Sequence, residues 1–172
     1  YEFRNGKFVH LYTYDNSPLV STFGNNKNYV SVQALQYDND NNLWVINCLN
    51  NEQNILELNS DNKWTSYFQA PLKGLALLSH PFFDRRGLLW FINDSYLTPS
   101  FYNYNIRNNT LTSYRSFVNE DGTSLNISYF HCITEDDDNN IWIGTNIGPF
   151  MLEPDQISAS NPILNQVKVP RN

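Results

Sequence analysis

Residues 133–146 read ITEDDDNNIWIGTN, and this stretch decides the fold that the sequence predicts. A short apolar run ends, a cluster of Asp and Asn follows, and a second apolar run opens around a tryptophan and closes at a glycine. Asp and Asn favour tight turns, and two short apolar runs joined by such a turn are typical of a β-hairpin. The stretch therefore predicts a hairpin whose second strand carries a buried tryptophan.

The same pattern occurs twice more in the chain. Residues 37–47 read YDNDNNLWVIN, and residues 83–93 read FDRRGLLWFIN. Trp90 follows Trp44 by 46 positions, and Trp142 follows Trp90 by 52. A repeat of this length with strand-like content predicts the blades of a β-propeller. In each copy an Asp stands six positions before the tryptophan, and the three pairs are Asp38 with Trp44, Asp84 with Trp90, and Asp136 with Trp142.

The segments after the first two tryptophans also repeat. Residues 55–59 (ILELN) and 63–67 (KWTSY) correspond to residues 101–105 (FYNYN) and 110–114 (TLTSY). Each repeat therefore offers four short strands. The predicted fold is all-β, a β-propeller fragment of about three to four four-stranded antiparallel blades. An unrelated β-sandwich is the alternative, but a sandwich gives no reason for one motif to occur three times.

We expect residues 1–172 to form a single partial propeller domain. Residues 1–15 resemble the back half of a blade, because an Asn-Gly turn lies between aromatic residues. Complete blades are expected at residues 29–68 and 79–115, and a less regular one at 127–169 that ends in a strand at 167–169. Closed propellers have about four to eight blades. We therefore expect either a larger native protein or self-association through open blade edges.

The third copy carries a family resemblance. The order from Asp136 through residues 142–146 (WIGTN) to Gly148 resembles the two-component regulator propeller repeat. The resemblance implies a non-enzymatic sensor propeller, periplasmic or at the cell surface, of the kind found in hybrid two-component systems of Bacteroidetes. It also leaves an alternative, since similar surface propellers act in type IX secretion and lipopolysaccharide delivery as docking proteins. The structural repeat positions that it implies are Trp44, Trp90, Trp142, Asp38, Asp84, Asp136 and Gly144.

Composition excludes some partners. The chain has 11 basic and 17 acidic residues and a net charge of −6. Nucleic-acid binding needs a basic surface to neutralise phosphates, so we expect no nucleic-acid partner. A membrane-spanning helix needs about 18 consecutive apolar residues, and no such run occurs in the sequence. We therefore expect no membrane segment in this chain.

The Asp-rich and Asn-rich stretches raise the question of calcium. Residues 38–42 and 136–140 resemble the opening of a calcium-binding loop, in which oxygen ligands alternate along the chain. However, the sixth positions are Leu43 and Ile141 where that loop needs glycine, and the twelfth positions lack its Glu. We expect hairpin turns in which Asp and Asn side chains bind the backbone. Calcium binding stays open as the alternative.

No catalytic motif is present. The sequence has no nucleophile elbow and no phosphate-binding loop, and its three histidines lack the spacing of a metal site. We predict no catalytic residue, no metal site and no cofactor, and we expect Cys48 and Cys132 to be separate buried thiols. A propeller lyase or glycosidase is the enzymatic alternative.

The ligand-binding residues are not identified by the sequence. The three repeated tryptophans are expected to do the same job in each blade, packing between neighbouring sheets. Trp64 and exposed tyrosines could instead stack on sugar rings, because aromatic faces complement the apolar patches of carbohydrate. The expected partner is an oligosaccharide or a protein, and it would contact the loops that join blades.

Overall fold

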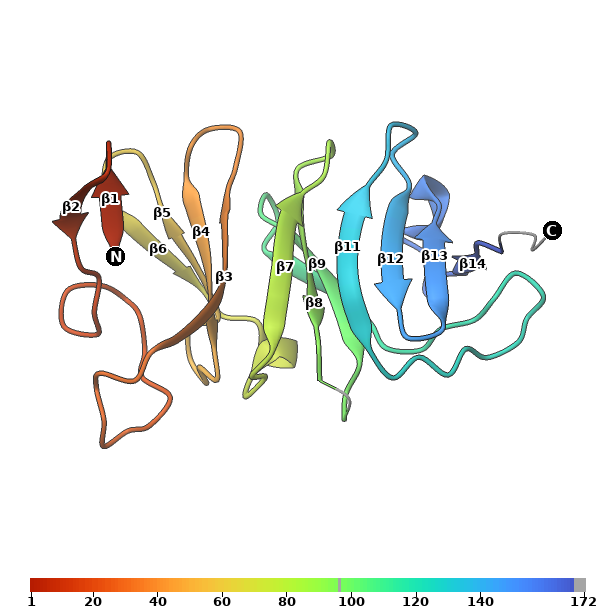
Figure 1. The fold of residues 1–172 in the computed structure, drawn as a ribbon, viewed down its shortest axis with the longest axis horizontal. Coiled ribbons are helices and arrows are strands. Elements are labelled where there is room, and N and C mark those ends of the chain that lie inside the picture. The colour runs from red at the N-terminus through yellow and green to blue at the C-terminus, as the bar shows by residue number, and fades with distance from the viewer. Residues whose placement is uncertain (96, 169–172) are drawn as a thin grey trace. The chain divides into compact units, whose positions relative to one another are not determined.

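The computed structural model describes residues 1–95 and 97–168. The chain divides into two compact units, Tyr1–Ala76 and Leu77–Asn172, which are described separately. Within the described residues, every sheet is antiparallel and the helices are two short 3-10 turns, η1 (Ala70–Leu72) and η2 (Pro154–Gln156). No helix in this part of the chain is long and apolar enough to cross a membrane. The all-β prediction is confirmed (Figure 1).

The first unit holds a two-stranded sheet and a four-stranded sheet. Strands β1 (Glu2–Arg4) and β2 (Lys7–His10) meet through Asn5 and Gly6, whose φ angles of 50° and 74° form the left-handed turn that suits a two-residue hairpin. The four-stranded sheet follows the chain order. Its strands are β3 (Ser31–Tyr37), β4 (Leu43–Cys48), β5 (Ile55–Leu58) and β6 (Trp64–Tyr67).

The second unit holds two four-stranded sheets, each again in chain order. Strand β11 contacts both β7 and β8, so the two sheets pack together (Figure 1). A shared apolar core that includes Trp90, Phe101, Phe130 and Phe150 fills the space between them. The first sheet is β7 (Leu78–Phe83), β8 (Leu88–Asn93), β9 (Ser100–Asn105) and β10 (Thr110–Tyr114), and the second is β11 (Phe130–Glu135), β12 (Ile141–Thr145), β13 (Gly148–Leu152) and β14 (Asn165–Gln166).

The last strand differs from the prediction. We expected it at residues 167–169, but β14 occupies Asn165–Gln166, and Val169 lies outside the described residues. Strand β14 pairs with β13 through Asn165 opposite Met151 and Gln166 opposite Phe150. The preceding residue, Leu164, donates its backbone amide to the Val118 carbonyl, and the Val167 amide still donates to the Pro149 carbonyl of β13.

The first strand of each four-stranded sheet is bulged. Pairing shifts between Val32 and Ala34 in β3, between Ser79 and Phe82 in β7, and between Phe130 and Cys132 in β11. A bulge adds a residue to one strand and re-aims its side chain. The residues at these bulges, Gln33, His80 and His131, are exposed.

Candidate functional site

The repeated Asp and Trp are joined by a hydrogen bond in each of the three four-stranded sheets. The indole Nε1 donates to Asp Oδ2 at 2.9 Å for Trp44 and Asp38, 2.8 Å for Trp90 and Asp84, and 2.6 Å for Trp142 and Asp136. The Asp begins the turn between the first and second strands, and the Trp is the second residue of β4 and of β12 and the third residue of β8. The spacing of six residues is the length of chain that lets the carboxylate reach back to the indole.

The other carboxylate oxygen holds the turn itself. Asp38 Oδ1 accepts the backbone amides of Asp40 and Asn42, each at 2.9 Å. The other two copies use the same pattern, through Asp84 and Asp136. Both oxygens are thus engaged by the turn, as expected for side-chain to backbone capping. In the described residues, no group of three or more His, Cys, Asp or Glu side chains could hold a metal ion.

The fourth turn residue needs a left-handed backbone. Asn41, Gly87 and Asn139 have φ angles of 62°, 79° and 65°. Glycine adopts this region without steric cost, and asparagine tolerates it better than other residues do. This requirement explains why the turns are rich in Asn and why the second copy has a glycine at the same position.

The hydrogen bonds shift the acidity of these groups. Bonds from Asn140 and Trp142 lower the pKa of Asp136 to about 2. Burial alone would raise the pKa of Asp38, but bonds from Trp44 and Asn42 outweigh it and lower that pKa. Both carboxylates therefore stay ionised at neutral pH, which is the form that accepts hydrogen bonds from the turn.

In the middle copy, Leu88 stands where the other copies have Asn42 and Asn140. Arg86 donates to the Asp carboxylate in place of that asparagine and also binds the next blade. Arg86 Nε donates to Asp84 Oδ2 at 2.8 Å, and Arg86 also reaches Glu135 Oε1 at 3.2 Å and the Asn139 carbonyl at 3.0 Å. Arg85 adds an ion pair with Asp137 at 2.8 Å. Through these bonds, the two arginines join the Asp84 turn of one blade to the Asp136 turn of the neighbouring blade. Nothing in the repeat spacing predicts this contact.

Two of the three tryptophans stack on a tyrosine of the fourth strand. Trp44 lies over Tyr67 with ring centroids 5.7 Å apart and an interplanar angle of 20°. Trp90 lies over Tyr114 at 5.8 Å and 21°. Both tryptophans are buried, as the repeat predicts.

The prediction that all three tryptophans pack alike is wrong for Trp142, which is only half-buried. Trp142 lies opposite Met151, and Met151 lies opposite Asn165. In the first two four-stranded sheets, Thr65 and Thr112 hold the position on the fourth strand that Asn165 holds here. The stacking tyrosines, Tyr67 and Tyr114, lie two residues later along that strand. In the third sheet, that place is taken by Val167, which has no ring to cover the indole.

Gly144 lies close to the side chain of its cross-strand neighbour. A Cβ atom at this position would lie 2.6 Å from Cys132 Sγ, closer than non-bonded atoms approach. Cys132 lies opposite Gly144 in the sheet and is exposed, so the expectation of a buried thiol is wrong there. Cys48 is buried, and neither cysteine forms a disulfide.

A groove of about 1170 Å³ lies within the first unit, between the two-stranded sheet and the four-stranded sheet. Aromatic and apolar side chains line it, among them Tyr12, Trp64, Tyr37 and Leu35. Trp64, which we expected as a sugar-stacking candidate, is half-buried and contacts Tyr12 edge-on at 5.4 Å. The Trp64 ring is therefore engaged by a protein neighbour, although its side chain borders the groove.

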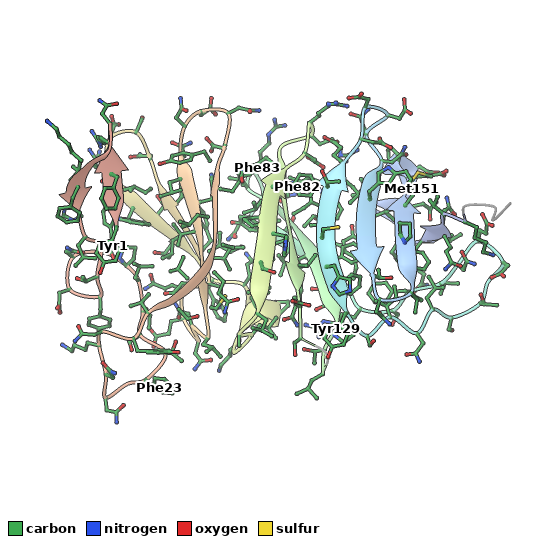
Figure 2. The ribbon with its side chains drawn as sticks, in the orientation of Figure 1. Tyr1, Phe23, Phe82, Phe83, Tyr129 and Met151 are labelled. Atoms are coloured by element: carbon green, nitrogen blue, oxygen red, sulfur yellow. The ribbon has the colours of Figure 1, made fainter. Side chains whose placement is uncertain are left out.

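Exposed aromatic pairs stand apart from the repeat positions. In the loop before β3, Phe23 and Tyr29 lie with centroids 5.0 Å apart, and each is 52% exposed. In the second unit, Tyr129 and His131 are parallel within 6° at 6.4 Å. Figure 2 labels Phe23 in the loop before β3 and Tyr129 beside the first residue of β11. Their position in loops between blades was the signal available in the sequence, but the sequence did not single them out.

Comparisons with known proteins support both the predicted fold and the family resemblance. Residues 124–146 match the family model described as two component regulator propeller, so the predicted resemblance is confirmed over the stretch that holds Asp136, Trp142 and Gly144. No curated protein sequence matches the chain significantly. Solved propeller structures share the fold, which confirms the β-propeller prediction.

Two similar structures come from different bacterial systems. PorZ, a surface component of the type-IX secretion system of Porphyromonas gingivalis, is 21% identical with a TM-score of 0.79, and the match covers 94% of this chain and 23% of that one. The extracellular domain of a candidate hybrid two component system from B. thetaiotaomicron is 17% identical with a TM-score of 0.56, and the match covers 81% and 19%. This chain therefore spans about a fifth of the length of these structures.

Proposed function

We propose that this chain is part of the ligand-sensing propeller of an extracytoplasmic two-component regulator, acting by recognition and not by catalysis. The observation that carries the proposal is the family match at residues 124–146, where the Asp136 turn and Trp142 lie. The shared fold with the extracellular domain from B. thetaiotaomicron supports it. Sensing requires a ligand that binds two states of the receptor with different affinity.

The ligand that we favour is a neutral oligosaccharide. The exposed rings of the Phe23–Tyr29 pair and the parallel Tyr129–His131 pair offer flat faces, and such faces complement the apolar sides of sugar rings. The net charge of −6 disfavours a strongly anionic ligand. Both pairs belong to or adjoin loops between strands, where ligand contacts concentrate.

A second candidate is a docking propeller of a cell-surface secretion or lipopolysaccharide-delivery apparatus. The likeness to PorZ covers 94% of this chain and supports this candidate. In that case the exposed rings would contact a protein partner, and no change of state would follow binding.

Calorimetric titration with a panel of neutral plant and host oligosaccharides tests the proposal. We expect one of them to bind, and we expect Tyr29→Ala or Tyr129→Ala to weaken binding at least tenfold. Phe68→Ala, at another exposed ring, is the matched control and should leave affinity unchanged. Release of product from any oligosaccharide would identify an enzyme and overturn the proposal.

The gene that encodes this chain separates the two candidates. A membrane span followed by a histidine kinase supports the sensor. A C-terminal sorting domain with no kinase, together with no binding in the oligosaccharide panel, supports the docking protein and rejects the sensor.

A further inference from the structure

The parallel rings of Tyr129 and His131 depend on two different supports. His131 lies in the bulge of β11, between Phe130 and Cys132, and both of these neighbours pair with β12. The sheet therefore fixes the backbone on either side of His131. Tyr129 comes just before β11, so the ladder between β11 and β12 does not include it. A separate contact holds Tyr129 in place.

Asn146 provides that contact from the end of β12. Its side-chain Oδ1 accepts the backbone amides of Ser128 at 2.9 Å and of Tyr129 at 3.0 Å. Its own backbone amide donates to the Tyr129 carbonyl at 3.2 Å. Both the amide and the carbonyl of Tyr129 are therefore bound to one residue, and a rotation of this backbone would break those hydrogen bonds.

The turn that carries Asn146 is itself fixed. This turn joins β12 to β13 and lies at the same end of the sheet as the start of β11 (Figure 1). Thr145 Oγ1 donates to the Gly148 carbonyl at 2.7 Å and accepts the Ile147 amide at 3.2 Å. Gln166 Nε2 donates to the Ile147 carbonyl at 3.2 Å. Asn146 therefore has a defined position, as the support of a preorganised binding group requires.

The middle blade keeps the backbone bond without the side-chain bonds. Leu77 and Asp94 stand there in the positions of Tyr129 and Asn146, each one residue outside the corresponding paired strands. The Asp94 amide donates to the Leu77 carbonyl at 3.0 Å. Within the described residues, no hydrogen bond joins the Leu77 amide to the Asp94 side chain. Between these two blades, the side-chain bonds occur in the one that carries the ring pair.

Asparagine suits the task of holding a ring without stabilising the whole fold. Its carbonyl oxygen has two lone pairs and can accept two amides. Because Asn146 is exposed, water can replace its bonds when the side chain is removed, and the melting temperature should change little. Binding is more sensitive to geometry, since a displacement of about 1 Å is enough to spoil a binding or catalytic site.

We infer that Asn146 is a positioning residue of the ligand site, whose side chain holds Tyr129 beside His131 so that the two rings form one platform. The rings are parallel within 6° at 6.4 Å, and together they accept the flat apolar side of a sugar chain. This role rests on the proposed function, because the platform is part of the oligosaccharide site proposed above. It gives a purpose to the asparagine that ends the WIGTN motif.

Calorimetric titration of the whole chain with cellohexaose, xylohexaose and mannohexaose tests this role. Asn146→Ala should weaken binding of the recognised hexasaccharide at least tenfold. Asn146→Asp keeps an oxygen that accepts both amides and should retain most of the affinity. Asp94→Ala changes the equivalent position of the middle blade and is the matched control, which should bind as the unchanged chain does. Unchanged affinity in Asn146→Ala would overturn the inference.

A double variant separates positioning from a general loss of structure. In a Tyr129→Ala chain, Asn146→Ala should cause no further loss of affinity, because the ring that Asn146 positions is already absent. Losses that add would show that Asn146 acts by another route and would contradict the inference. Asn146→Gln moves the amide oxygen by one methylene and serves if Asn146→Ala loses its native circular dichroism spectrum. Its affinity should also fall at least tenfold, and wild-type affinity would reject the positioning role.

The ring pair can also be followed without any ligand. A parallel phenol ring shifts the NMR frequency of nearby imidazole protons, so the His131 Hε1 signal in Asn146→Ala should move toward its place in Tyr129→Ala. Amide exchange at Ser128 and Tyr129 should become faster. If no hexasaccharide binds the unchanged chain, the proposed function fails. The NMR signal then still decides the role of Asn146, and an unmoved His131 signal with unchanged exchange would reject it.

Discussion

The middle and third blades carry the same Asp and Trp motif but bury it differently. In the middle blade, Trp90 is fully buried and Asp84 is 2% exposed. In the third blade, Trp142 and Asp136 are both half-buried, although the indole and the carboxylate are joined by the same bond. The motif thus builds the hairpin by local interactions, whereas the fourth strand and the neighbouring sheet decide whether the hairpin becomes core.

The fourth strands explain the difference. Strand β10 supplies Tyr114, whose hydroxyl binds Asn103 and the carbonyl of Ile157 while its ring covers Trp90. Strand β14 has two residues and places Val167 where that ring would stand. A stacked aromatic ring excludes water from the indole, and a valine at the same register does not.

Replacing the tryptophans should give the largest contrast. Trp90→Ala should lower the free energy of unfolding by about 3–5 kcal/mol, because it leaves a large cavity in packed core. Trp142→Ala should cost about 1–2 kcal/mol, since water already reaches part of that side chain. Urea denaturation of both variants measures the two losses. Equal losses would show that the third blade is packed as tightly as the middle one.

The turn carboxylates should differ in the same direction. Asp84→Asn should cost about 2–3 kcal/mol, because the amide turns a donor toward the Trp90 indole and Arg86 in a buried site. Asp136→Asn should cost less, because water can bind the groups that the carboxylate leaves. Thermal unfolding by circular dichroism compares the pair. A larger loss for Asp136→Asn would contradict the proposed dependence on burial.

The two arginines should separate buried from exposed ion pairs. Arg86→Ala should cost about 2 kcal/mol, since its side chain bonds to Asp84 and Glu135, both largely buried. Arg85→Ala should cost less than about 1 kcal/mol, because its pair with Asp137 lies in solvent. Denaturation at low salt and in 1 M NaCl checks this, and the Arg85 contribution should shrink with salt while the Arg86 contribution persists.

Supplying the absent ring should make the blades more alike. Val167→Tyr places an aromatic ring at the register of Tyr67 and Tyr114, so it should stabilise the chain by about 0.5–1.5 kcal/mol through stacking on Trp142. Quenching of tryptophan fluorescence by acrylamide should fall at the same time. The double variant with Trp142→Ala should lose the gain, and a gain that survives there would exclude stacking as its cause.

Acid should weaken the third turn as Asp136 becomes protonated. The pKa of Asp136 is lowered to about 2, below the value of about 3.9 expected in the unfolded chain. A depressed pKa stabilises the fold above the unfolded value, and the contribution is lost as pH falls from about 4 toward 2. Urea midpoints measured between pH 5 and pH 2 should therefore fall, with a shallower fall in Asp136→Asn. Identical pH dependence in both chains would contradict the assignment.

The hairpins could be predicted because their causes are local. The hydrogen bonds of Asp38, Asp84 and Asp136 reach only residues within the next six positions. Asn41 and Gly87 are residue types that favour the left-handed backbone that the turn needs. The contacts that join blades could not be predicted. Arg86 and Glu135 are 49 positions apart, and neither residue type nor repeat spacing specifies that one reaches the other.

The candidate binding surfaces could likewise be predicted only in part. The sequence indicated that loops between blades would carry ligand contacts, but it did not distinguish the exposed Tyr129 from the buried Tyr114. Nor did it reveal the groove beside Tyr12, because the residues that line it come from two different sheets of the first unit.

The amino-acid sequence by itself determined the repeat, the all-β class and the Asp to Trp spacing, since turn geometry and strand pairing within a hairpin depend on neighbouring residues. Only the tertiary structure decided which tryptophans become core and which turns bind one another across blades. Burial of a tryptophan depends on side chains from strands that are distant in the sequence. A repeat with a period near 45 predicts which strands form, but it does not say which side chain will cover each tryptophan.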